Sequence, residues 1–139
     1  MTALTFPARL AGLQRERLLR LVLKLDAAVT GANGAAYLLA AGPLGDVLGL
    51  PSAPLRATGA FLVLYAAAVW VLATRATVRR VAVVAVIAAN VLWAVDSVVL
   101  AIAGWGSPAA PGTVWILLQA FVVAGLAAVQ WRVAPTPRS

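Results

Sequence analysis

The stretch VAVVAVIAANVLWAVDSVVLAIA, residues 81–103, decides how the chain folds. It runs for 23 residues without Lys, Arg, Glu, Gly or Pro, which is long enough for a helix to cross a hydrocarbon core of about 30 Å at about 1.5 Å per residue. It nevertheless contains Asn90, Trp93, Asp96 and Ser97. A carboxyl group inside hydrocarbon costs about 2.5 to 3.5 kcal/mol, so Asp96 is the first candidate for a functional residue.

Three further windows are long and apolar enough to be membrane helices, namely residues 21–41, 57–74 and 112–131. Only 11% of the 139 residues are charged and 63% are apolar, whereas about a quarter of a soluble domain is charged. We therefore predict an all-α, multi-pass protein of the cell membrane, with one domain over residues 1–139 folded as a four-helix up-and-down bundle. Residues 8–20 should form a short amphipathic helix along the inner leaflet before the chain turns into the membrane.

The net charge of +7 comes from cations that flank the predicted spans. Ten of the eleven fall on one side: Arg9, Arg15, Arg17, Arg20, Lys24, Arg75, Arg79, Arg80, Arg132 and Arg138. Only Arg56 falls on the other side. By the positive-inside rule both termini are cytoplasmic, and the partner of these charges is the lipid bilayer and not nucleic acid.

Cysteine and histidine are both absent from the sequence. Disulfides, thiolate chemistry, the usual zinc sites and imidazole-ligated haem are therefore excluded. We expect no metal and no cofactor.

The first predicted span carries a polar stripe, because Asp26, Thr30, Asn33 and Tyr37 fall on one face of a helix. Asp26 lies near the cytoplasmic end, close in depth to Lys24. We expect a structural role for Asp26, as a member of an interfacial ion pair.

Asn33, Tyr65, Asp96 and Gln119 come from four different helices, and each lies about 10 to 14 Å inside the outer end of its span. Such residues normally face a bundle interior or a cavity, so we predict one polar layer lining a pocket in the outer half of the bundle. The turn at residues 43–50 would cap the mouth of this pocket. A hydrogen-bond network that only holds the bundle together is the main alternative, and an ion path is a third. The substrate-binding candidates are Asn33, Tyr37, Tyr65, Asn90, Trp93, Trp115 and Gln119.

Asp96 has no Lys or Arg at its depth, and desolvation favours the neutral form of a carboxyl group. A neutral acid can donate a proton, so Asp96 is the candidate general acid. The chemistry would suit cyclisation or isomerisation of a terpenoid-like substrate, with Trp93 or Trp115 facing a developing cation. The same residues would equally suit passive binding of an isoprenoid, a quinone or another lipid-like molecule.

A family resemblance rests on two runs of residues. The first contains Asn33, Gly34 and Tyr37, then PLGDVLGLP at residues 43–51, then Leu55, Arg56, Gly59, Leu62 and Tyr65, and it resembles the first half of DoxX-like small bacterial membrane proteins. The second, Asn90, Trp93, Asp96 and Ser97, is similar to four-helix actinobacterial members of that group. The resemblance implies a four-helix membrane bundle, in a group with some members linked to membrane oxidoreductase systems. The lack of Cys and His argues against a direct redox role here.

Two stripes of small residues suggest a different class of function. They are Ala27, Gly31 and Ala35 in the first span and Ala120, Ala124 and Ala128 in the fourth. Such surfaces let helix backbones approach closely, so the protein could be an accessory subunit that packs against a membrane partner or a second copy. A small transporter is the weaker third option, because four short spans could form a pore only as an oligomer.

Overall fold

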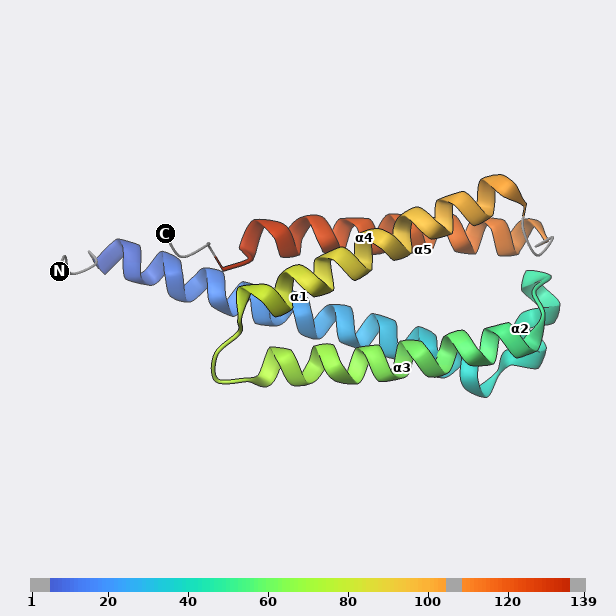
Figure 1. Cartoon of the computed structure of the whole chain (residues 1–139), viewed down its shortest axis with the longest axis horizontal. Coiled ribbons are helices and arrows are strands. Elements are labelled where there is room, and N and C mark those ends of the chain that lie inside the picture. Colours follow the sequence, from blue (N-terminus) through green and yellow to red (C-terminus); the bar gives the residue numbers. More distant parts are fainter. Residues whose placement is uncertain (1–5, 105–108, 136–139) are drawn as a thin grey trace.

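The computed structural model describes residues 6–104 and 109–135. Over these residues the chain forms five helices, which are α1 (Phe6–Leu39), α2 (Ala41–Leu48), α3 (Ser52–Thr74), α4 (Arg80–Ala103) and α5 (Ala110–Val133) (Figure 1). No strand occurs in this part of the chain. The prediction of an all-α fold is confirmed for the described residues.

The four long helices are arranged as two pairs (Figure 1). Helix α1 packs along α3, and α4 packs along α5, while the contact between α1 and α5 is less extensive and any contact between α3 and α4 is sparse. The short helix α2 lies across one end and touches α1, α3 and α5. The two pairs are therefore joined along one side more firmly than along the other.

Helices α3, α4 and α5 are each long and apolar enough to cross a membrane. Helix α1 contains most of the remaining predicted span. Over the described residues it is less apolar than the other three long helices and is not among those apolar enough to cross a membrane. The reason is that Lys24, Asp26 and Asn33 interrupt its apolar sequence. Three of the four predicted spans thus lie in helices that are long and apolar enough to cross a membrane.

The amphipathic segment at residues 8–20 is not a separate helix. The prediction that the chain turns after this segment is therefore wrong. Helix α1 runs unbroken from Phe6 to Leu39, and its first part extends beyond the other helices (Figure 1). Residues 13–30 contain no Gly or Pro that would break it. Residues 7–18 are exposed.

Two glycines allow α1 and α3 to pack closely. A Cβ atom at Gly34 would lie 2.8 Å from the Cβ of Leu62, and one at Gly59 would lie 2.6 Å from the carbonyl oxygen of Gly34. These distances are too short for any larger side chain, so the close approach requires glycine on both helices.

The small-residue stripe of α1 also packs within the chain. A Cβ at Gly31 would lie 3.3 Å from that of Ala66, and Ala27 is buried in the core. Gly31 and Ala27 are thus occupied within the chain, and not free for the predicted partner.

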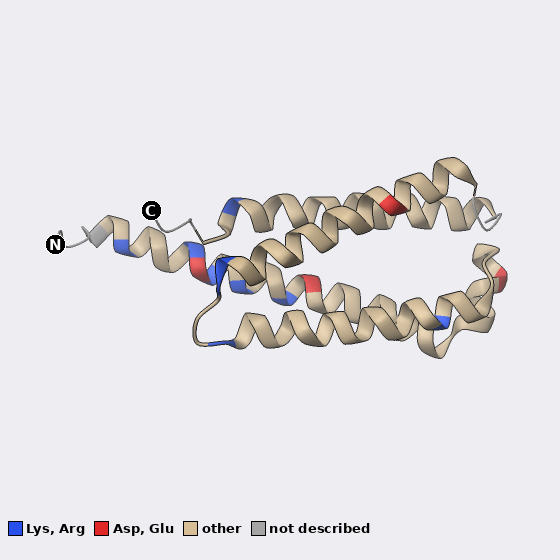
Figure 2. Cartoon of the chain, in the orientation of Figure 1, with Lys and Arg blue, Asp and Glu red and all other residues tan. Residues whose placement is uncertain are grey.

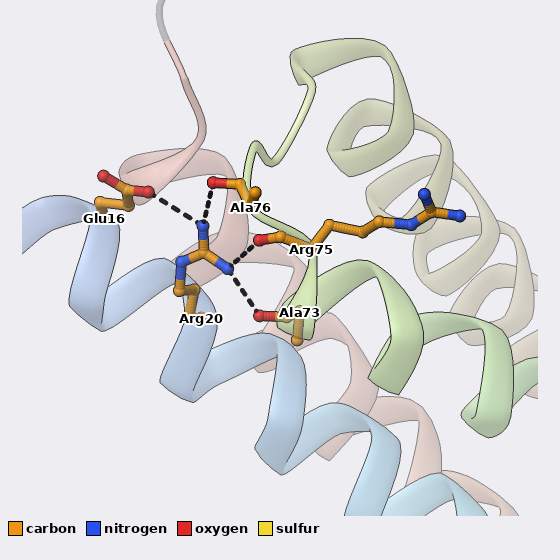
Figure 3. Close-up of polar contacts among 5 residues, drawn as sticks. All are labelled: Glu16, Arg20, Ala73, Arg75 and Ala76. Carbon is orange, nitrogen blue, oxygen red and sulfur yellow. Dashed lines mark hydrogen bonds and ion pairs between the residues drawn. The ribbon is translucent and has the colours of Figure 1, made fainter.

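Most cations of the described residues gather at the end of the molecule where α1 begins, α5 ends and the connection 75–79 lies (Figure 2). Arg20 donates hydrogen bonds to the carbonyl oxygens of Ala73 (2.9 Å), Arg75 (2.5 Å) and Ala76 (3.1 Å), and it pairs with Glu16 at 3.0 Å (Figure 3). The last carbonyls of a helix have no partner within it. Arg20 therefore satisfies the end of α3 and ties it to α1.

Arg15 does the same for the end of α5. It donates hydrogen bonds to the carbonyl oxygens of Arg132 (3.1 Å) and Ala134 (2.9 Å). Helix α1 thereby holds the ends of both helix pairs.

The other end of the bundle is closed by α2. Its capping residue Gly49 has φ of 69°, and a Cβ at this position would overlap the backbone nitrogen of Ala109. That nitrogen also donates a 3.0 Å hydrogen bond to the carbonyl oxygen of Leu48. Gly49 is required on both grounds, and it lets α2 lie directly against the start of α5.

Candidate ligand-binding site

A cavity of about 850 Å³ lies between the two helix pairs, with Leu44 and Leu48 of α2 in its wall. The segment 43–50, which we predicted to lie at the mouth of a pocket, thus contributes to the wall of the cavity. All eight predicted catalytic and substrate-binding residues line the cavity, namely Asn33, Tyr37, Tyr65, Asn90, Trp93, Asp96, Trp115 and Gln119. Most of the remaining wall consists of aliphatic side chains.

The cavity wall continues onto the surface of the molecule. Phe61 of α3 and Leu92 of α4 both line the cavity and are 58% and 62% exposed. Contacts between these two helices are sparse. The cavity therefore opens sideways between α3 and α4.

An outer cluster of polar side chains surrounds Tyr37, which is buried. Its hydroxyl oxygen accepts hydrogen bonds from Trp115 Nε1 and Gln119 Nε2, both at 2.7 Å, and Asn33 Nδ2 donates to Gln119 Oε1 at 2.9 Å. Helices α1 and α5 are thus joined by side chains beside α2. With the Gln119 amide in this orientation the Tyr37 oxygen accepts two hydrogen bonds, so the outer cluster does not use the hydrogen of the Tyr37 hydroxyl.

An inner cluster centres on Asp26, which is completely buried, as is Gln130. Asp26 Oδ2 accepts hydrogen bonds from Asn90 Nδ2 and Gln130 Nε2, both at 2.7 Å, and Oδ1 accepts one from Thr30 at 3.1 Å. Tyr65 donates to Asn90 Oδ1 at 3.2 Å. Every long helix contributes at least one side chain, so hydrogen bonds of the inner cluster connect the two helix pairs.

The expected ion pair of Asp26 is wrong. Among the described residues its carboxylate is hydrogen-bonded only by neutral side chains, and Lys24 lies over the ring of Trp70 at 5.5 Å. The physical reason is helical geometry, because two residues along a helix turn a side chain by about 200°. Asp26 faces the interior, and Lys24 consequently faces α3. The structural role of Asp26 remains the interpretation that the geometry favours.

The single polar layer is also wrong, because its four members separate. Asn33 and Gln119 belong to the outer cluster, Tyr65 belongs to the inner cluster, and Asp96 belongs to neither. The predicted layer rested on the depth of each residue counted from the outer end of its span. That count ignores the tilt of each helix and the axial offset between neighbouring helices. Tyr65 consequently meets α4 at Asn90, nearly two turns away from Asp96.

Gln130 belongs to the inner cluster but is not among the site residues that we predicted from the sequence. It lies eleven residues after Gln119, which places both amides on the same face of α5. This spacing is the signal that would have identified it.

Asp96 lines the cavity but is exposed, and no described residue donates a hydrogen bond to it or pairs with it. The cavity wall contains no Lys or Arg. Asp96 is thus the one carboxyl group of the described residues that both borders the cavity and lacks a partner there. Its neighbour Trp93, three residues earlier on α4, also lines the cavity.

Over residues 6–104 and 109–135 the fold is thus all-helical, three of its helices are long and apolar enough to cross a membrane, and a largely apolar cavity lies between two helix pairs. Comparison with protein-family models, with curated proteins and with solved structures finds no match. The site must therefore be interpreted from its own geometry.

Proposed function

We propose that the protein crosses the cell membrane as a four-helix up-and-down bundle of α1, α3, α4 and α5, with both termini cytoplasmic. The distribution of charge supports this orientation. Helix α1 is suited to the bilayer despite its composition. From residue 21 onward its exposed side chains are all apolar, for example Leu21, Leu25 and Leu38.

Within the membrane the protein binds a lipophilic molecule in the cavity between the helix pairs. The observation that carries this proposal is the cavity itself, which has a largely apolar wall and a few polar groups. Its volume of about 850 Å³ lies in the range of about 300 to 1,000 Å³ that is typical of small-molecule sites. The opening between α3 and α4 would admit a molecule directly from the lipid.

The geometry favours binding over catalysis. A catalytic group is normally held in a defined position by the packing and hydrogen bonds of its neighbours. None of the described residues forms a hydrogen bond or an ion pair with Asp96. Conversion of the bound molecule is therefore the less supported form of the proposal.

A direct test is to purify the protein in detergent and to identify the apolar molecules that remain bound by mass spectrometry. Ala36 lines the cavity and Ala67 lies on the exposed surface of α3 away from it. Ala36→Phe should deplete the bound molecule several-fold, and Ala67→Phe should retain it. Equal retention by both variants would show that the cavity is not the binding site.

A second candidate is a subunit that associates through α5. Ala124 and Ala128 are exposed, and a Cβ at Gly125 would meet no other atom within 4 Å. Ala124, Gly125 and Ala128 are thus uncovered within the described chain, unlike the stripe on α1, whereas Ala120, the first residue of the predicted stripe, is buried.

A further inference from the structure

We propose that the molecule taken up by the cavity is a lipophilic cation, such as an amine or quaternary ammonium group on an apolar body. This inference rests on the proposed binding function and specifies the charge of its ligand. It follows from the charges and the aromatic rings that line the cavity.

The first argument is electrostatic. Asp96 borders the cavity without a cationic partner, and no Lys or Arg of the described chain lines the cavity. An isolated carboxylate is unfavourable at membrane depth. A cation bound beside it would offset that cost, because the attraction between opposite charges is strong where the dielectric constant is low.

The second argument is the number of aromatic side chains in the wall. Tyr37, Phe61, Tyr65, Trp93 and Trp115 all line the cavity. The face of an aromatic ring attracts a cation by about 0.5 to 2 kcal/mol, depending on how far the pair is removed from water. Trp115 is held in place by its hydrogen bond to Tyr37, and Trp93 shares a face of α4 with Asp96. The wall thus offers both a carboxylate and ring faces to a cation.

The other charge classes fit this wall less well. Asp96 would repel an anion such as a fatty-acid carboxylate, and no Lys or Arg of the wall would offset the repulsion. A neutral lipid would gain no ion pair with the carboxylate. Binding of an anion as tight as that of the cation is therefore a contrary outcome of the test.

The test compares three phenyl-substituted probes, namely the cation tetraphenylphosphonium, the anion tetraphenylborate of the same shape, and the smaller neutral triphenylmethane. Their binding to detergent-solubilised protein is measured by equilibrium dialysis, and partition into empty micelles is subtracted. The variants are Asp96→Asn, which removes the charge at nearly constant shape, and Asp46→Asn as the matched control. Asp46 lies on α2, is exposed and does not line the cavity.

The wild-type protein should bind the cation at least ten-fold more tightly than Asp96→Asn does, and Asp46→Asn should match the wild type. Triphenylmethane should bind equally to all three, which shows that the cavity of Asp96→Asn is intact. The inference is overturned if Asp96→Asn binds the cation as well as the wild type does, if it loses both probes together, or if the anion binds as tightly as the cation. If Ala36→Phe changes the binding of no probe, the proposed binding function itself fails.

Discussion

Asn90 donates a 2.7 Å hydrogen bond to the buried carboxylate of Asp26, joining residues that are 64 positions apart in the sequence. The bond connects α4 to α1, and thus one helix pair to the other. Gln130 of α5 donates to the same carboxylate oxygen. Because contacts between α3 and α4 are sparse, the inner cluster is a principal element that sets the separation of the pairs and hence the shape of the cavity.

Replacing Asp26 by Leu should destabilise the folded protein. The substitution leaves the amide groups of Asn90 and Gln130 without their acceptor, and a buried donor without a partner costs about 1 to 3 kcal/mol. Thermal unfolding in detergent, followed by circular dichroism, should show a clearly lower midpoint. Asp46→Leu, on the exposed face of α2, is the control and should unfold as the wild type does. An unchanged midpoint for Asp26→Leu would show that the cluster contributes little to stability.

Adding a single methyl group at Gly34 or Gly59 should also destabilise the protein. In either variant the new Cβ would lie less than 3.0 Å from backbone atoms of the facing helix, so α1 and α3 must separate. Gly125→Ala is the matched control, because its Cβ would meet nothing within 4 Å. We expect unfolding midpoints to fall for Gly34→Ala and Gly59→Ala and to stay constant or rise for Gly125→Ala. Equal effects at all three positions would argue against close packing of α1 on α3.

Replacing Arg20 by Met should loosen the connection between α3 and α4. The carbonyl groups of Ala73, Arg75 and Ala76 would lose their donor, while the aliphatic part of the side chain is kept. Hydrogen exchange measured by mass spectrometry should become faster in peptides that cover residues 73–79. Arg17→Met alters an exposed position of α1 and should leave that exchange unchanged. Equal exchange in the two variants would contradict the role of Arg20.

The second candidate function predicts a change in assembly. If copies or partners associate through α5, Ala124→Leu should reduce the mass of the detergent-solubilised particle measured by light scattering, because the larger side chain prevents close approach. Ala67→Leu on α3 is the control. A wild-type protein that is already a single chain would exclude association of copies through this face, and an assembly that Ala124→Leu leaves intact would exclude that face as its interface.

The sequence predicts the helices that contain most of the cavity wall, because an uninterrupted apolar run and helical periodicity are local properties. Residues 81–103 correspond to α4 within one residue, and the candidate residues on all four long helices do line one cavity. The partners of these residues could not be predicted. Whether Tyr65 meets Asn90 or Asp96 depends on the tilt and axial offset of α3 against α4, and packing over the whole length of the helices sets both quantities.

The unbroken course of α1 illustrates the same limit. Its charged first half and its polar-striped second half suggested two segments with different surroundings. The sequence between them contains no helix-breaking residue, so the backbone continues as one helix. Local sequence decides where a helix ends more reliably than a change of composition does.

Tryptophan fluorescence offers the most direct test of the central claim that the cavity binds a lipophilic molecule. Trp115 lines the cavity, whereas Trp131 is an exposed residue of the same helix outside it. Two proteins that each retain one of these tryptophans, with the others replaced by Phe, are titrated with a neutral brominated alkane in detergent. Our account predicts saturable quenching of Trp115 that Ala36→Phe abolishes, and only weak, non-saturating quenching of Trp131. Identical, non-saturating quenching of both tryptophans would contradict it.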